Sequence, residues 1–343
     1  MRYPVSFAQR RVWAIDQLVD DAAASSLCHA SWLDGQVDTV ALQQAMDVLV
    51  ARHAALRTSI VSSDVWPEQV VADTGQVPID QVVLADGPDG AARAELLAVE
   101  LAGRPFDLAR GPLLRAALIA VADQRSLFVL AAHRIIADDV ALAILLDELS
   151  TVYQNSAATL PPLWMDYGDY AVWQRERLRG EELSRQLDHW HEPLRDAPAD
   201  HTLPTDRPRT GAASPAEGAL VTASLDTTAT RQLADLAQAA GTDLSTAVLA
   251  GYAVVLARYT RQADLVIGVP VGGRVRVELT PIVGPFADTV PVRVSLGDTA
   301  TFAEVLDQVR DVSTAAQSHD ELPLDLLIEE LGIGPVCRAA RFT

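Results

Sequence analysis

RSLFVLAAHRIIADD, residues 125–139, begins as a run of apolar residues and ends in charged ones. The apolar part, Arg125–Ala132, predicts a buried β-strand. Further on, apolar residues recur at intervals of three and four and predict a long helix: Leu142, Leu145, Leu149 and Val152. Sites are often built on such a turn between two rigid elements. The candidate site therefore consists of the polar residues at this junction: His133, Arg134, Asp138 and Asp139.

Helical and extended patterns alternate on both sides of this junction, which indicates an α/β or α+β protein. The first helix is predicted to begin at Ser6, because Gln9 three residues later completes a capping box. Between residues 160 and 218 the composition shifts to proline, aromatic and charged residues, and a second α/β block follows. We therefore divide the chain into an N-terminal lobe, residues 1–173, and a C-terminal lobe, residues 174–343.

The formal net charge of −19 limits the classes of partner. A protein this acidic repels the phosphates of nucleic acids and the surface of anionic membranes. It attracts a partner with a basic patch, or the charge only keeps the protein soluble. Composition alone does not separate these two interpretations.

The cysteine and histidine patterns argue against a disulfide framework and against a metal site. The chain has two cysteines, Cys28 and Cys337, and neither has a partner at metal-ligand spacing. His189 and His191 are two apart on a predicted helix and so do not face each other. No apolar run is long enough to span a bilayer, and Met1–Pro4 does not begin a signal peptide. We expect a cytoplasmic protein without a metal.

Segments along the whole chain resemble, in order, the motifs of the condensation domains of nonribosomal peptide synthetases. They are Ser6–Trp13, Arg52–Thr58, Arg104–Leu108 with Gly111–Arg115, Asp166–Trp173, Ile282–Thr289 ending at Arg293, and His319–Leu327. Three residues depart from the pattern: Ala54 stands for a glutamate, Asp288 for an asparagine and Leu324 for a phenylalanine. Because the family usually continues well past the position of Thr343, we expect the C-terminal lobe to be incomplete.

The resemblance implies an α/β (α+β sandwich) fold of two lobes like chloramphenicol acetyltransferase, arranged as a V-shaped pseudo-dimer around a tunnel. In active members, carrier domains deliver a thioester donor and an amine acceptor to this tunnel. The signature His-His-x-x-x-Asp-Gly lies at its centre, and the second histidine assists attack by the amine.

This sequence has Arg134 in place of the second histidine and Asp139 in place of the glycine. A guanidinium, with a pKa above ~12, has no site that accepts a proton, so Arg134 does not replace the base. We expect Arg134 to be buried in the tunnel, where Asp138 or Asp139 would neutralise it, and we expect no catalytic residue.

The remaining junction residues have structural interpretations. Asp138 or Asp139 is suited to cap the following helix, because acids are favoured at helix N-termini. In the family the retained aspartate pairs with an arginine, for which Arg274 is the first candidate and Arg293 the second. His133 is expected to be a hydrogen-bonded core residue rather than a catalyst.

The His-Arg-x-x-x-Asp-Asp form resembles the X domain of glycopeptide antibiotic synthetases. X domains are inactive in condensation and recruit cytochrome P450 oxygenases, which cross-link aromatic side chains of the peptide on the neighbouring carrier domain. The resemblance implies a non-enzymatic domain without a cofactor of its own. Haem would belong to the oxygenase, and phosphopantetheine to the carrier domain.

Three other functions stay open at this stage. The chain could be an active condensation or epimerisation domain with a rearranged site, a free-standing acyltransferase of the same fold, or a structural spacer between synthetase modules. The first two need a base that the sequence does not offer at the expected position. A spacer would bind only its neighbouring domains.

Overall fold

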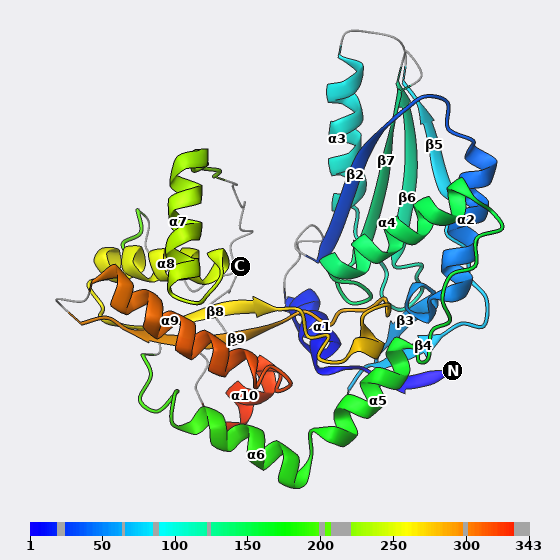
Figure 1. Ribbon diagram of the computed structural model, residues 1–343. Helices are drawn as coiled ribbons and strands as arrows, with labels where there is room; N and C mark the ends of the chain where they lie inside the picture. The colour runs from blue at the N-terminus through cyan, green and yellow to red at the C-terminus, as the bar shows by residue number, and fades with distance from the viewer. Residues whose placement is uncertain are drawn as a thin grey trace. The chain divides into compact units, whose positions relative to one another are not determined.

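The computed structural model describes residues 1–18, 25–63, 66–84, 89–121, 125–198, 203–206, 221–297 and 301–332. The chain forms two compact units (Figure 1): unit 1 is Met1–Arg177 with Arg274–Ala287, and unit 2 is Leu178–Gly273 with Asp288–Thr343. The chain first passes from unit 1 to unit 2 after Arg177, close to the predicted division at residue 173. The segment Arg274–Ala287 returns to unit 1, which a division at a single point of the sequence does not describe.

Unit 1 contains the strands and helices of the predicted N-terminal lobe. In chain order they are β1 (Arg2–Pro4), α1 (Phe7–Leu18), β2 (Ser26–Asp34), α2 (Thr39–Arg52), η1 (Ala54–Arg57), β3 (Thr58–Val61), β4 (Glu68–Val71), β5 (Ile79–Val83), α3 (Gly90–Gly103), β6 (Leu114–Val121), β7 (Arg125–His133), α4 (Asp139–Gln154) and α5 (Tyr167–Arg177), followed by η2 (Val277–Leu279) in the returning segment. The predicted buried strand is β7, and the predicted long helix is α4. The capping box at the start of α1 is confirmed, because Ser6 N donates to Gln9 Oε1 (3.0 Å) and Gln9 N to Ser6 Oγ (3.1 Å).

The main sheet of unit 1 has the strand order β2-β7-β6-β5 and is antiparallel except for the β5–β6 pair. Helices α2 and α4 cover one face, and α3 covers the other (Figure 1). Leu130 of β7 packs in the first layer with Leu145 of α4, and Val129 packs in the second with Ala98 of α3. Because both faces of β7 are covered, its residues are apolar without alternation, which explains the run in the sequence.

A smaller sheet with the order β1-β4-β3 completes unit 1. The described part of unit 2 contains α6 (Gly180–His191), α7 (Thr227–Ala239), α8 (Leu244–Thr260), β8 (Asp264–Val271), β9 (Asp288–Ser295), α9 (Phe302–Gln317) and α10 (Leu324–Glu330). Strands β8 and β9 form an antiparallel pair, and α9 packs against both β9 and α8. Among the described helices none alone has the length and apolar composition to cross a bilayer, although α7 and α8 together, bent by 103°, have both.

Aromatic packing ties the segment Arg274–Ala287 to unit 1. Phe286 packs edge-on against Tyr167 of α5, with ring centroids 5.0 Å apart. The Tyr167 hydroxyl donates to the Pro285 carbonyl (2.7 Å) and accepts from the Ser6 hydroxyl (2.8 Å). The start of α1, α5 and the returning segment therefore meet around one buried tyrosine. This meeting positions Arg274, the candidate partner of Asp138.

A substitution at Gly284 tests this packing, because a Cβ atom there would overlap the ring of Tyr167. We expect Gly284→Ala to lower the free energy of unfolding by about 1–3 kcal/mol, the usual effect of overpacking. Denaturant unfolding measures it. Gly251→Ala is the matched control, since a Cβ atom there meets nothing within 4 Å and alanine favours helix α8. Equal stability of the two variants would contradict the packing described.

Candidate functional site

The candidate site is the junction between β7 and α4. Backbone hydrogen bonds define its course: His133 N donates to Leu113 O (2.9 Å), and Arg134 N donates to Ser25 O (2.8 Å). The turn ends at Asp138, the N-cap of α4, whose carboxylate accepts from Ala141 N (2.7 Å). All four residues singled out in the sequence lie at this junction: His133 ends β7, Arg134 and Asp138 lie in the turn, and Asp139 begins α4. The structure gives them different roles.

Asp138 is the best-connected side chain of the site and is only 6% exposed. Its two oxygens accept from Arg274 Nη1 (2.8 Å) and Nη2 (3.0 Å), a bidentate ion pair. They also accept from the backbone N–H groups of Phe286 (3.0 Å) and Ala287 (3.1 Å). With the capping bond to Ala141, five N–H groups surround one carboxylate, as a buried anion requires.

Arg274 is thus the partner of Asp138, and Arg293 is not. The Arg274 guanidinium lies over the Phe286 ring, 4.5 Å from its centroid, and Nη2 also donates to Ile282 O (3.3 Å). Arg293 pairs within unit 2, where Nη2 lies 2.6 Å from an oxygen of Asp264. This pair holds the pKa of the Asp264 carboxyl below its usual value, chiefly through the hydrogen bond.

His133 is buried, 2% exposed, and both of its ring nitrogens are engaged. The Ile135 backbone N–H donates to Nδ1 (3.1 Å), so the ring proton lies on Nε2, which donates to Asp16 Oδ1 (3.2 Å). Phe106 packs edge-on against the ring, with centroids 5.9 Å apart. Burial lowers the pKa of His133, while the bond to Asp16 opposes this. His133 is therefore a neutral, fixed core residue with no free nitrogen to accept a proton.

Asp16 is a site residue that the sequence analysis missed. It lies on α1 and is 117 positions from His133 in the chain. The only signal was one acidic residue on a predicted helix, just after the opening motif Ser6–Trp13. A single acid on a helix is more often solvated than paired, so the sequence offered no reason to select it.

The expectation that Arg134 is buried against Asp138 or Asp139 is wrong. The Arg134 side chain is exposed, and within the described part of the chain it forms no ion pair. Asp138 already has Arg274 as its partner, and Asp139 is exposed at the first position of α4. A solvated guanidinium needs no buried counter-charge, which explains why the turn tolerates arginine here.

His189 and His191 of α6, already excluded as a metal pair by spacing, differ in their surroundings. His191 is exposed, whereas His189 stacks on His319, with ring centroids 3.5 Å apart and planes 11° apart. Among the described residues, no group of three or more histidine, cysteine or acidic side chains is placed to hold a metal. Burial lowers the pKa of both stacked histidines. Repulsion from His319 lowers the pKa of His189 further, and the charge of Arg185 lowers that of His319.

The Asp138–Arg274 pair yields a stability prediction. Asp138→Asn removes the anion and leaves the Arg274 guanidinium buried without a counter-charge. We expect a loss of about 3–5 kcal/mol in the free energy of unfolding, measured with urea. Asp264→Asn is the matched control, because its pair with Arg293 is partly exposed and should contribute no more than about 1 kcal/mol. Similar losses in both variants would refute the central role of Asp138.

The stacked histidines yield a pH prediction. A histidine whose pKa is lowered by folding binds fewer protons in the folded than in the unfolded state. Its neutral form therefore supports the fold above the unfolded-state pKa of about 6.5, and stability falls as the pH drops below that value. His189→Phe keeps a ring in the stack but removes the titrating group. We expect its melting temperature to fall less between about pH 7 and about pH 5 than that of the wild type. His191→Phe should behave like wild type, and an unchanged His189→Phe profile would count against the stack.

Comparison with known proteins places this geometry in a family. Residues 1–334 match the family model described as Condensation domain. Tyrocidine synthase 3 of Brevibacillus parabrevis is 36% identical over 331 residues, which are 96% of this chain and 5% of that protein. Phosphinothricin tripeptide synthetase PhsC of Streptomyces viridochromogenes is 35% identical, over 95% of this chain and 31% of that protein. The chain thus spans a small part of these relatives.

Solved structures agree with this assignment. The complex of the X-domain and OxyB from teicoplanin biosynthesis contains a chain that matches with a TM-score of 0.85 and 29% identity, covering 97% of this chain and 74% of that one. The condensation domain of the Monacolin K polyketide synthase MokA matches with a TM-score of 0.84 and 23% identity, covering 97% and 76%, which shows the shared fold. The chain therefore belongs to the condensation-domain family of peptide synthetases.

Proposed function

We propose that this chain is a condensation domain without condensation activity that recruits cytochrome P450 oxygenases to a carrier-bound peptide. In this function the oxygenases cross-link aromatic side chains during glycopeptide antibiotic biosynthesis. The observation that carries the proposal is the junction between β7 and α4, where Arg134 stands in place of a base and His133 has both ring nitrogens engaged.

Amide formation needs a group that takes a proton from the attacking amine near neutral pH. At this junction Arg134 has no acceptor site, and the lone pair of His133 Nδ1 is used by the Ile135 N–H. The Asp138 carboxylate is occupied by five N–H groups. Asp139 is exposed at the first position of α4, outside the buried part of the junction that holds His133 and Asp138. The junction therefore supports a fold rather than a proton transfer.

The comparisons support the finer part of the proposal. An X-domain solved in complex with OxyB is similar to this chain over nearly its whole length, and the X-domain from teicoplanin biosynthesis solved alone has a TM-score of 0.84 and 29% identity. The resemblance of His133-Arg134 and Asp138-Asp139 to the X-domain form of the signature points the same way.

Recruitment works through effective concentration. An oxygenase bound beside the carrier domain meets the tethered peptide intramolecularly, at up to ~mM effective concentration. The net charge of −19 favours fast association with a basic surface, and this attraction is screened by salt. The domain would need no cofactor of its own, since haem belongs to the oxygenase and phosphopantetheine to the carrier domain. We place this assembly in the cytoplasm.

Active condensation is the second candidate function, because the curated relatives at 34–37% identity include several peptide synthetases. Restoring the histidine separates the two. We expect Arg134→His to form no amide from carrier-bound donor and acceptor, because Asp139 still stands in place of the glycine. Arg134→His with Asp139→Gly is the companion variant, and mass spectrometry of the carrier-bound product is the measurement. Amide formation by the wild-type chain would refute the proposal.

Recruitment itself is tested by calorimetric titration of the domain with the P450 oxygenases encoded beside its synthetase, at about 0.05 M and about 0.5 M salt. We expect a specific complex whose affinity falls as salt screens the charges. Arg134→His should bind as wild type does, since the docking surface is proposed to lie outside the junction. If no oxygenase binds, the domain is a structural spacer between modules or an enzyme of another kind.

A further inference from the structure

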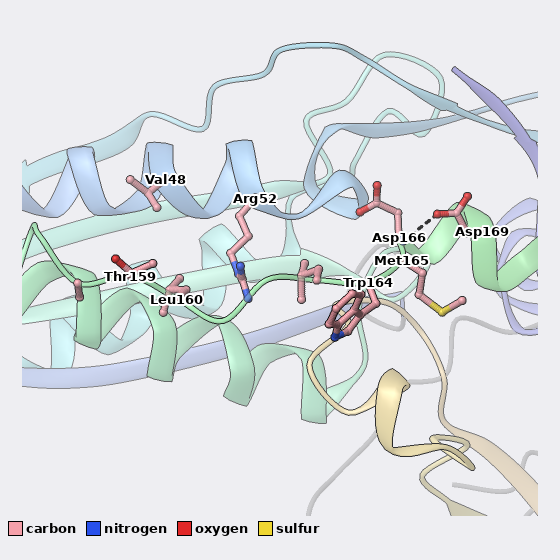
Figure 2. Close-up of a pocket in the computed structure, with 10 residues that line it drawn as sticks. Val48, Arg52, Thr159, Leu160, Trp164, Met165, Asp166 and Asp169 are labelled. Carbon is pink, nitrogen blue, oxygen red and sulfur yellow. Dashed lines mark hydrogen bonds between the residues drawn. The ribbon is translucent and has the colours of Figure 1, made fainter.

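Unit 1 carries an open hollow of about 650 Å³ outside the junction, between the end of α2 and the loop that joins α4 to α5. Figure 2 shows Arg52 extending from α2 toward this loop, which carries Trp164, Met165 and Asp166. The side chains that shape it include Val48, Arg52, Leu163, Trp164, Asp166 and Asp169. We call this surface the Trp164 groove.

Trp164 leaves most of its surface in water. It is 84% exposed, although both neighbours in the chain, Leu163 and Met165, pack against the aromatic cluster around Tyr167. Val48 across the groove is also exposed. A tryptophan this exposed gains hydrophobic free energy when a partner covers it, and tryptophan is strongly enriched among the residues that dominate binding.

The positive charge in the groove is already neutralised. Arg52 Nε donates to both carboxylate oxygens of Glu148, each at 3.1 Å, and Nη2 donates to Pro161 O (2.6 Å). Glu148 in turn is hydrogen-bonded to His53 at 2.7 Å. Arg52 is therefore held by its own unit and has little charge to offer an incoming anion.

The negative charge in the groove is balanced only in part, by a backbone hydrogen bond from Ala54 to Asp166 and by the charge of Arg57. Asp166 and Asp169 lie together, since Asp166 N donates to Asp169 Oδ2 (3.0 Å). Across the described residues neither carboxylate forms an ion pair. Burial and then the charge of Asp169 raise the pKa of Asp166, and the charge of Arg57 opposes them only in part. An incoming cation would relieve this repulsion.

We propose that the Trp164 groove is the docking surface for the recruited oxygenase, which binds through a segment that presents an arginine or lysine beside an apolar side chain. The guanidinium or ammonium pairs with Asp166 and Asp169 and lies against the Trp164 ring, a cation–π contact. The apolar side chain covers Val48 and Leu163. This inference rests on the proposed function and names the surface that performs it.

The charge complementarity also selects the kind of partner. An acidic segment would meet two unpaired carboxylates and a neutralised Arg52, and like charges brought together this way cost several kcal/mol. A purely apolar segment would bury Asp166 and Asp169 without a counter-charge, since the hydrogen bonds that they accept from Ala54 and from Asp166 come from uncharged backbone groups. Only a basic segment with an apolar residue satisfies both halves of the groove.

The experiment is a calorimetric titration of the whole domain with each purified P450 oxygenase encoded beside its synthetase. We expect Trp164→Ala to weaken binding about tenfold or more, as loss of a dominant aromatic contact does. The pair Asp166→Asn with Asp169→Asn should weaken binding and flatten its salt dependence. Thermal unfolding of each variant shows that the fold is retained, and Trp164→Ala alters an exposed side chain only.

Matched controls remove the same kinds of group elsewhere on unit 1. Trp66→Ala removes an exposed tryptophan that already has Arg10 over its ring, at 4.9 Å. Glu95→Gln with Glu100→Gln removes two charges from α3, on the other side of the main sheet. Neither control should change the affinity by more than about twofold.

The outcomes are distinct. Weaker binding of the groove variants alone supports the inference. If wild type binds and the groove variants bind no worse than the controls, the groove is not the docking surface, and the proposed function stands without it. If wild type binds no oxygenase, both the inference and the proposed function are overturned.

Discussion

The carboxylate of Asp138 is the point on which the rest of unit 1 depends. It caps α4 through Ala141 N, pairs with both Nη atoms of Arg274, and accepts from the backbone of Phe286 and Ala287. A buried anion is stable only while such donors surround it. The end of β7, the start of α4 and the segment that returns from unit 2 are therefore held in one arrangement.

The same arrangement separates the junction residues that support the fold from those that face solvent. His133 and Asp138, which support the structure, are buried and fully bonded, whereas Arg134 and Asp139 are exposed. Substitutions at exposed positions away from buried networks usually change stability by less than about 0.5 kcal/mol. The junction could thus change its chemistry while keeping its geometry. On the surface of the same unit, the Trp164 groove combines an exposed aromatic ring with two carboxylates that form no ion pair among the described residues.

Charge acts at two ranges in this protein. The net charge of −19 acts over a distance of about one Debye length, near 10 Å in 0.1 M salt, and speeds the approach of a basic partner without choosing its orientation. In the proposed complex, Asp166 and Asp169 would act at contact, where Trp164 and Val48, both exposed in the free domain, would be covered. The orientation and affinity of the partner in that complex would come from these local contacts.

The sequence by itself determined the elements that depend on neighbours in the chain. The apolar run of β7, the spacing in α4 and the capping box of Ser6 and Gln9 are local patterns, and each was readable because strands, helices and caps follow fixed periods. The resemblance to a family also identified Arg274 as the partner of Asp138, although the two residues are 136 positions apart in the chain. Only the tertiary structure decided that Asp16 bonds His133, that Arg134 is exposed, and that Arg274–Ala287 joins unit 1. These facts depend on which distant segments meet and which side chains they leave in water, and no local period encodes that.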